Sequence, residues 1–162
     1  MSAHFHLAQV NIARARGSLD SDIMRGFVEQ LDAINALADR SPGFVWRLQT
    51  DDGDATSIDA FGDPRIIVNM SVWESLSTLK DYVYAGDHLK LLQNKKSWFE
   101  KMAAPSLALW WIPAGTLPTI DDARRALAAL QEGGSTAAAF TFARPCPPPE
   151  SVPGPTPSPQ SA

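Results

Sequence analysis

Apolar and polar side chains alternate along the first part of the chain, which is the pattern of a β-strand. In His4–Ala13 both alternating sets are largely apolar, so both faces of this strand are expected to be at least partly buried. Two later stretches, Phe44–Thr50 and Arg65–Val72, carry strand patterns and are joined by the Asp- and Gly-rich loop Asp51–Asp63. They predict a hairpin with a long acidic connection, and the apolar stretch Leu107–Ile112 predicts a fourth strand.

Helical spacing of apolar residues, together with capping signals, predicts the helices. Asp20–Arg40 is a helix pattern that ends at a Ser-Pro-Gly sequence, and Ser18 and Asp20 are cap candidates. Ser71 and Glu74 have the S-x-x-E spacing of a capping box, so a helix is expected to begin there. It is expected to continue to residue 102 as two pieces, broken near residues 85–87.

The C-terminal part predicts one more helix and one more strand. Thr119 and Asp122 have capping-box spacing at the start of the helix pattern Thr119–Leu130. Two glycines, Gly133 and Gly134, mark the end of this helix, and Thr136–Phe142 predicts a final strand.

The order of these elements predicts an α+β fold. Strand, helix, strand, strand, helix, strand over residues 4–112 is the order of a ferredoxin-like, split βαβ protomer, with the C-terminal helix and strand added to it. The helices of such a protomer cover one face of the antiparallel sheet. Because the strands are apolar on both faces, the other face must also be covered, and a homodimer that pairs two sheets as a dimeric α+β barrel is expected to cover it.

Composition limits the class of protein. Of 13 prolines in 162 residues, eight lie between Pro145 and Pro159, so we expect one domain over residues 1–144 and a disordered Pro-rich tail over residues 145–162. A net charge of −4 without a basic block argues against nucleic acid as a partner, and the apolar runs are too short for a membrane span. The expected location is the cytoplasm. The single cysteine, Cys146, excludes an intrachain disulfide, and no metal site is expected.

Polar residues recur at matching places on strands that otherwise look buried. Gln9 and Asn11 share one face of the first strand, and Asn69 and Ser71 share one face of the third. If both faces line one cavity, these groups form the polar part of a small-molecule site. They could equally satisfy one another for structural reasons. Arg47, on the second strand, either meets a carboxylate or an anionic ligand group on an inner face, or points outward.

His88 follows the break between the two helical pieces, where its imidazole could be a general base, a general acid or a metal ligand. A helix cap or a surface histidine is the plainer alternative. The five tryptophans mostly indicate packing, but adjacent strand residues point to opposite faces, so either Trp110 or Trp111 should face the candidate cavity. An aromatic wall beside Asn and Arg suits a flat, partly polar organic ligand.

Five sequence strings together resemble one bacterial family of stand-alone domains of unknown function, number 3291. That family is similar to the antibiotic-biosynthesis-monooxygenase group of dimeric α+β barrels. The resemblance covers about His4 to Phe142. The strings are HLAQVNI from His6, SPGFVWRL from Ser41, VNMSVWE from Val68, His88 followed by SWF from Ser97, and WWIPAG from Trp110.

The resemblance implies roles for some of these residues. In cofactor-free oxygenases of the wider group an Asn and a Trp four residues later position the substrate, and Asn69 and Trp73 look like that pair. The tyrosine that follows in those enzymes would fall near Leu79, and the nearest tyrosines here are Tyr82 and Tyr84. In haem-using relatives a helical histidine binds iron, and His88 is the candidate.

We therefore expect a small-molecule tailoring enzyme of secondary metabolism, monooxygenase-like or cyclase-like, without an organic cofactor. Its ligand is expected to be a small hydrophobic or aromatic molecule of polyketide-like type, bound in an apolar barrel pocket. His88 is the expected base, Asn69 and Arg47 the donors to a developing oxyanion, and Trp73 part of the enclosure. The alternatives are a haem enzyme with His88 as axial ligand and a non-catalytic ligand-binding module. The further substrate-binding candidates are Gln9, Asn11, Trp46, Tyr84, Trp98 and Trp111.

Overall fold

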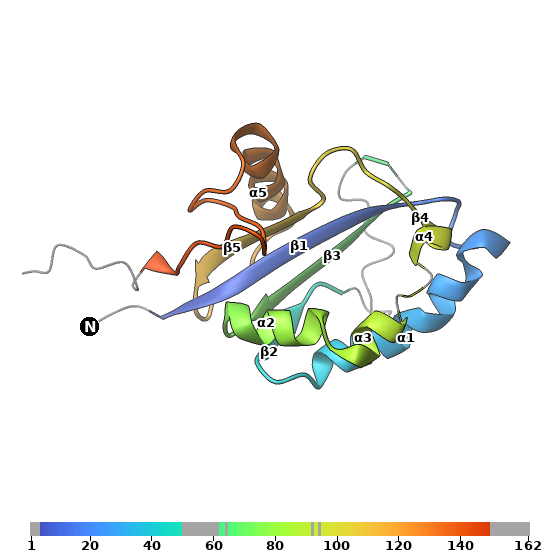
Figure 1. The fold of residues 1–162 in the computed structure, drawn as a ribbon, viewed down its shortest axis with the longest axis horizontal. Helices are drawn as coiled ribbons and strands as arrows, with labels where there is room; N and C mark the ends of the chain where they lie inside the picture. Colours follow the sequence, from blue (N-terminus) through green and yellow to red (C-terminus); the bar gives the residue numbers. More distant parts are fainter. Residues whose placement is uncertain (1–3, 50–61, 64, 92, 94, 150–162) are drawn as a thin grey trace, which may run out of the picture.

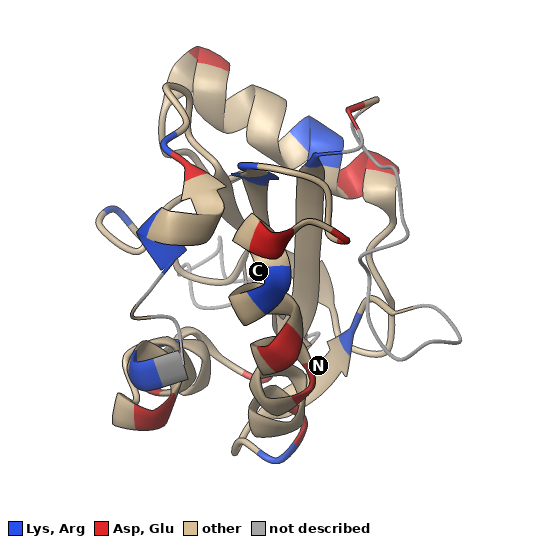
Figure 2. Ribbon diagram, turned by 90° about the vertical axis from the view of Figure 1, so that its right-hand side faces the viewer, with Lys and Arg blue, Asp and Glu red and all other residues tan. Residues whose placement is uncertain are grey.

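The computed structural model describes residues 4–49, 62–63, 65–91, 93 and 95–149. It is an α+β protein in which a single antiparallel sheet lies between two layers of helix (Figures 1 and 2). The predicted acidic loop over residues 51–63 falls largely outside the described residues, as does most of the Pro-rich tail. The strands are β1 (Phe5–Ala15), β2 (Phe44–Arg47), β3 (Ile66–Trp73), β4 (Phe99–Glu100) and β5 (Leu107–Pro113).

The strand order confirms the split βαβ prediction. β1 is central, with β3 on one side and both β5 and, at its end, β4 on the other, while β2 pairs with the outer edge of β3. Every pairing is antiparallel, so the order β2, β3, β1, β5 is that of a ferredoxin-like protomer. β1 extends to Ala15, two residues beyond the predicted end, because its last residues pair with β4.

One face of the sheet, here called the α1 face, is covered by the helices between the strands. Its residues include Leu7, Gln9 and Asn11 of β1 and their cross-strand partners Trp73, Ser71 and Asn69 of β3. The covering helices are α1 (Arg25–Asp39), α2 (Leu76–Val83), α3 (Gly86–Leu91) and α4 (Lys95–Trp98), and the 3-10 turn η1 (Asp22–Met24) precedes α1.

The opposite face, here called the α5 face, is covered within the same chain by α5 (Ile120–Gly133). Four residues of α5 at helical spacing are buried against the strands, and small side chains such as Ala8 and Ala108 on the sheet let the helix approach closely. The need to cover a second apolar face, which motivated the homodimer prediction, is therefore met in part by α5. The buried residues of α5 are Ala123, Ala126, Leu127 and Leu130.

Of the two predicted capping boxes, one is confirmed and the other is wrong. The capping box of Thr119 and Asp122 is confirmed, with the Thr119 side chain accepting from the Asp122 amide and the Asp122 carboxylate accepting from the Thr119 amide. The capping box at Ser71 and Glu74 is wrong. β3 continues to Trp73, and α2 begins after Ser75, whose side chain accepts from the Thr78 amide at 3.2 Å.

Three further predictions are corrected by the structure. Ser18 and Asp20 do not cap α1, which follows η1 and has Met24 at its N-cap without a side-chain hydrogen bond. The region from residue 74 to 102 forms three short helices and β4 rather than two helical pieces. The final strand over 136–142 is replaced by two isolated bridges, of which Phe140 with Leu109 is the longer-range one, because the segment turns back on itself between Thr136 and Ala139.

Gly43 fixes the turn from α1 into β2, and with it the position of α2. Its φ is +83°, its carbonyl accepts from the Glu74 amide at 2.8 Å, and a Cβ at this position would lie within 2.6 Å of Thr78 Oγ1. Only glycine combines a left-handed backbone with this close approach to a neighbouring helix.

We predict that Gly43→Ala lowers the free energy of unfolding by roughly 2–5 kcal/mol, since a left-handed backbone costs ~1–2 kcal/mol and overpacking adds about 1–3. Gly115→Ala is the matched control, because Gly115 has a φ of +90° but open space around its Cβ position. It should lose only about 1–2 kcal/mol. Urea unfolding measures both, and equal losses would show that Thr78 does not constrain the turn.

Candidate functional site

A polar strip crosses the middle of the α1 face. The strand register places Gln9 opposite Ser71 and Asn11 opposite Asn69, so the four side chains lie on one face as the alternation predicts. Gln9 Nε2 donates to Asn69 Oδ1 at 2.7 Å and to Ser71 Oγ at 2.9 Å. The polar groups therefore converge on one place, as expected of a ligand site. Gln9 and Ser71 also fulfil part of each other's hydrogen-bonding requirement, which is the structural alternative.

Ser71 connects this strip to the aromatic side chains of the site. Its Oγ also accepts from Trp73 Nε1 at 2.8 Å, and Trp73 is fully buried. The indole packs edge-on against Phe44, with ring centroids 5.5 Å apart, and stacks on Tyr82 at 5.0 Å with an interplanar angle of 26°. Trp73 is thus fixed in orientation by one hydrogen bond and two ring contacts.

Tyr82, which the sequence pattern did not single out, lies at the centre of the aromatic cluster. Its hydroxyl donates to the Ile34 carbonyl of α1 at 3.4 Å. Burial, and next the negative charge of Asp39, raise the pKa of the phenol to about 12, against the opposing effect of Arg47. Tyr82 is therefore a neutral hydrogen-bond donor at physiological pH.

His88 packs against the other side of this cluster, with its ring centroid 4.6 Å from that of Tyr82. Its Nδ1 lies 3.0 Å from the Val83 carbonyl oxygen, and because a carbonyl only accepts, the Nδ1–H donates. This contact leaves the lone pair of the neutral ring on Nε2. Burial and the nearby charge of Lys95 lower the pKa of His88, although the Val83 hydrogen bond opposes them.

Arg47 points inward, which settles the alternative that the sequence left open. Its side chain is 11% exposed and pairs with Asp39 of α1 through two contacts, Nε to Oδ1 at 2.8 Å and Nη2 to Oδ2 at 3.3 Å. The protein carboxylate is therefore one partner of this guanidinium. Since the pKa of Tyr82 responds to both charges, the pair lies close to the phenol.

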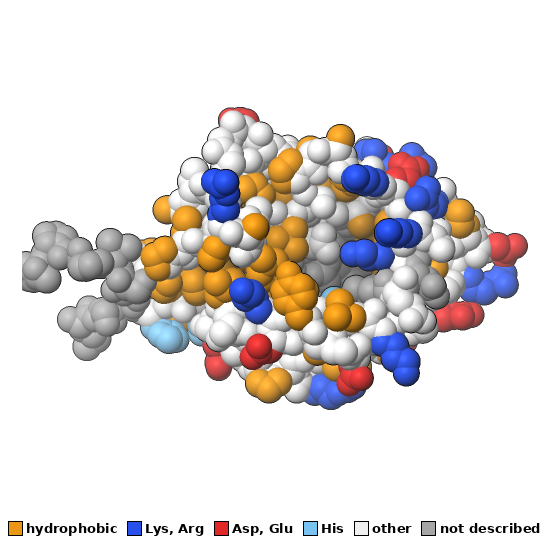
Figure 3. All heavy atoms as spheres, in the orientation of Figure 1, with side chains coloured by type: hydrophobic (Ala, Val, Ile, Leu, Met, Phe, Trp, Pro, Cys, Tyr) orange, Lys and Arg blue, Asp and Glu red, His pale blue; other side chains and the backbone are white. Residues whose placement is uncertain are grey.

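The helices leave the centre of the α1 face open. At one end Leu7, Trp73 and Leu79 are part of one buried cluster, and at the other end Phe27 and Trp98 are part of another. Between these clusters the side chains of Asn11 and Asn69 remain exposed although they belong to the covered face. Figure 3 shows a hollow on this side of the molecule. Solvent, and by the same route a ligand, has access to the polar strip.

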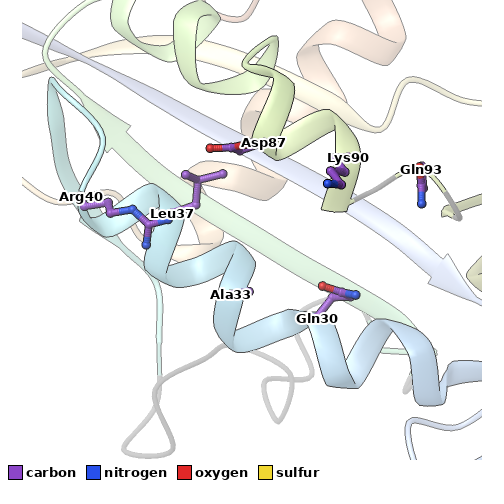
Figure 4. A pocket seen from close by; sticks show the side chains of 7 residues that line it. All are labelled: Gln30, Ala33, Leu37, Arg40, Asp87, Lys90 and Gln93. Carbon is purple, nitrogen blue, oxygen red and sulfur yellow. The ribbon is translucent and has the colours of Figure 1, made fainter.

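A groove of about 420 Å³ lies between α1 and α3 (Figure 4). Its volume is within the range of small-molecule sites. The α3 side of the groove includes Asp87, the residue before His88, and its α1 side includes the aliphatic side chains of Ala33 and Leu37. The lining residues are Gln30, Ala33, Leu37, Arg40, Asp87, Lys90 and Gln93.

The candidate residues divide into two groups. Gln9, Asn69, Trp73, Arg47 and His88 belong to one set of contacts on the α1 face, and Asn11 lies at its open margin. The other four lie outside this set of contacts. Trp98 packs with Phe27 at the far end of this face, Trp46 lies against the α5 core, Trp111 donates to the Cys146 carbonyl, and Tyr84 is 58% exposed beside Phe142.

Sequence reasoning missed three contributors: Tyr82, Asp39 and the linking role of Ser71. For Ser71 a signal was present, because residues two apart on a strand share a face and Ser71 stands two before Trp73. Strand alternation placed Ser71 on the third strand beside Asn69, but the S-x-x-E spacing used the Ser71 side chain as a helix cap and did not link it to Trp73. No sequence signal pairs Tyr82 with His88, because they meet only where the chain bends between α2 and α3.

No group of three or more His, Cys, Asp or Glu residues in the described part could hold a metal ion. No helix among the described residues is long and apolar enough to cross a bilayer.

The fold and site together define a small α+β protein with an antiparallel ferredoxin-like sheet and an open polar strip beneath its helices. The chain belongs to the family described as Domain of unknown function (DUF3291), which it matches over residues 6–154. None of the curated proteins is significantly similar to it.

Solved structures of low sequence identity are similar to this chain. SnoaB, a cofactor-independent oxygenase from Streptomyces nogalater, is 18% identical with a TM-score of 0.44, and the match covers 70% of this chain and 98% of SnoaB. A protein from Nitrosomonas europaea with the provisional name antibiotic biosynthesis monooxygenase is 18% identical with a TM-score of 0.43, covering 72% and 94%. A conserved protein from Methanosarcina mazei Go1 is 8% identical with a TM-score of 0.47, covering 67% and 92%.

The lowered pKa of His88 predicts how its contribution to stability depends on pH. In the unfolded chain His88 takes up a proton near its ordinary pKa of about 6.5, whereas the folded chain binds that proton only at lower pH. The unfolded state therefore binds more protons in this window, and the stability contributed by neutral His88 is complete above about pH 6.5 and falls as the pH drops below it.

We expect the free energy of unfolding of the wild type to fall relative to that of His88→Gln as the pH is lowered from about 7.5 to 5.5. Urea unfolding of both proteins measures this difference. Subtracting the free energy of unfolding of the variant from that of the wild type removes the contribution of the carboxylates, which titrate in both proteins. His4→Gln controls for replacing a histidine at an exposed position. A difference that moves in favour of the wild type at low pH would contradict the assigned environment of His88.

Proposed function

We propose that this protein is a small-molecule tailoring enzyme, monooxygenase-like or cyclase-like, that acts on an aromatic or polyketide-like metabolite without an organic cofactor. The observation that supports this most is the state of His88. Its Nδ1–H is held by the Val83 carbonyl and its pKa is lowered, so Nε2 carries a lone pair at neutral pH. An imidazole in this state is suited to general-base catalysis.

In the proposed reaction His88 removes a proton from an electron-rich phenol or enol. Asn69 then acts as a donor to the developing oxyanion through its Nδ2. Its Oδ1 accepts from Gln9, and its Nδ2 has no hydrogen-bond partner among the described residues. Arg47, held by Asp39, supplies positive charge beside the cluster. Trp73 and Tyr82 supply the aromatic wall that excludes water.

For an oxygenase the deprotonated carbon reacts with O₂ directly. Anthrone is a suitable probe, because loss of its ring proton gives an electron-rich carbanion. Anthrone plus O₂ gives anthraquinone plus water, so the substrate is the reductant and the balance needs no further reagent.

Haem binding through His88 is the second candidate. The Nδ1–H to carbonyl contact is the arrangement that orients metal-ligating histidines through the other ring nitrogen. Bound haem would supply oxygen or peroxide chemistry, and His88 would be the residue that holds it. Arg40 and Lys90 in the adjacent groove are suited to the haem carboxylates.

We predict that the wild-type protein consumes O₂ with anthrone and that His88→Ala lowers kcat by about a hundredfold or more, the usual contribution of a general base. Asn69→Ala should lower kcat by about tenfold to a hundredfold, because it removes an oxyanion donor. An oxygen electrode measures the rate. His4→Ala is the histidine control and should keep the wild-type rate.

The same preparations separate the alternatives. Anthrone binding without O₂ uptake indicates a non-catalytic ligand-binding module. A Soret band after addition of haemin that is lost in His88→Ala indicates the haem protein. Equal O₂ uptake by wild type and His88→Ala rejects the assignment of the base.

We also propose a homodimer. It is supported by apolar residues on the part of the α5 face near β2 and β3, where Trp46, Leu48 and Ile66 are only partly buried. Light scattering after gel filtration should give twice the chain mass of 17.6 kDa, and a monomer mass at all concentrations would reject this arrangement.

A further inference from the structure

The groove between α1 and α3 carries positive charge on both of its sides. Arg40 lines it from the end of α1, and Lys90 lines it from α3 (Figure 4). One negative charge, Asp87, also lines the α3 side. The groove is therefore net positive in a chain whose net charge is −4.

These basic residues differ from most arginines of the chain in having no acidic partner among the residues that the structure describes. Six arginines form ion pairs, among them Arg47 with Asp39 and Arg65 with Glu100. Among the described residues, Arg40 and all five lysines form no such pair. A cation without an intramolecular partner is available to a ligand at a lower cost than one whose ion pair must first be broken.

The lysines are also concentrated in one stretch of the sequence, which begins at the groove with Lys90. Four of the five lie between residues 90 and 101, and the only acidic residue in that range, Glu100, is paired with Arg65. Basic side chains gather on the side of the molecule where α4 and β4 lie (Figure 3). Lys95 is close enough to His88 for its charge to lower the pKa of the imidazole. The positive field therefore reaches the candidate base.

We propose that the ligand of this site carries an ionised acidic group that binds in the groove between α1 and α3, where Arg40 and Lys90 supply the positive charge. This inference rests on the proposed function and narrows it to aromatic acids. The acid group lies at the groove, while the apolar part of the ligand lies against Ala33 and Leu37 and extends toward His88 and Asn69. The same field raises the rate at which an anionic ligand reaches the opening.

The test compares 1-naphthoate with 1-naphthamide, which have nearly the same shape and differ in charge. NMR titration of the ¹⁵N-labelled full chain gives both Kd values and the site of binding. In the wild type we expect naphthoate to bind about fivefold to tenfold more tightly, with amide shifts in α1 and α3. The double variant Arg40→Gln/Lys90→Gln should remove that preference and leave naphthamide affinity unchanged.

Two matched variants check that the effect is local. Lys80→Gln/Arg144→Gln removes the same charge at exposed positions outside the groove and should keep the preference for naphthoate. Asp87→Asn should strengthen naphthoate binding about twofold to fivefold, because it removes a like charge from the groove. About 0.5 M salt should reduce the preference in the wild type.

The outcomes separate this inference from the proposed function. If both probes bind in the groove with equal affinity, or if the preference survives Arg40→Gln/Lys90→Gln, the inference is wrong while an aromatic-binding site stands. If neither probe binds, both the inference and the proposed function are rejected. A preference lost equally in Lys80→Gln/Arg144→Gln also overturns the inference, because it shows an effect of net charge alone.

Discussion

The rest of the structure depends on one constraint: β1 is the central strand and is buried on both faces. A polar side chain on such a strand must find its hydrogen bonds inside the protein, and Gln9 finds them on Asn69 and Ser71 of the neighbouring strand. Ser71 in turn accepts from Trp73. Burying an indole contributes roughly 4–6 kcal/mol by area, whereas leaving its N–H unpaired costs about 1–3 kcal/mol. The Ser71 hydroxyl therefore avoids a loss of about 1–3 kcal/mol from the stabilisation that Trp73 provides. It also fixes the indole on which Tyr82 stacks, and His88 packs in turn on Tyr82.

The two faces of the sheet have different roles in this protein. The α5 face is closed by a helix of small and aliphatic residues and makes a conventional core. The α1 face is closed only at its two ends, by the clusters that contain Trp73 and Trp98, and is open at its polar centre. Because the rigid strands carry the polar strip, its residues keep their positions while the helices above them form the groove. His88 follows Asp87, which lines this groove, and packs on the Tyr82 side of the aromatic cluster.

Much of the fold could be predicted from sequence, because alternation and helical spacing are local signals. They identified β1, α1, β3, β5 and α5 and the ferredoxin-like order. The failures share a physical cause. Ser71 satisfied a local helix-start pattern, but its hydroxyl is used by Gln9 and Trp73, which lie across the sheet or further along the strand. The segment over 136–142 has strand composition, yet it closes on itself at Thr136 and Ala139. For the site, strand alternation placed Gln9, Asn69 and Ser71 together, whereas the partners of Arg47 and His88 depend on how helices pack and could not be read from spacing.

Both proposed roles of His88 require a neutral imidazole with its proton on Nδ1 and a free lone pair on Nε2. Long-range ¹H–¹⁵N NMR of the histidine rings, assigned with His88→Gln and followed from about pH 8 to 5, tests this directly. We predict an Nδ1-protonated tautomer for His88 that takes up its second proton only below its ordinary pKa of about 6.5. A ring protonated on Nε2, or one that becomes cationic above that pH, would contradict this state of His88 and with it the proposed roles as base and as iron ligand.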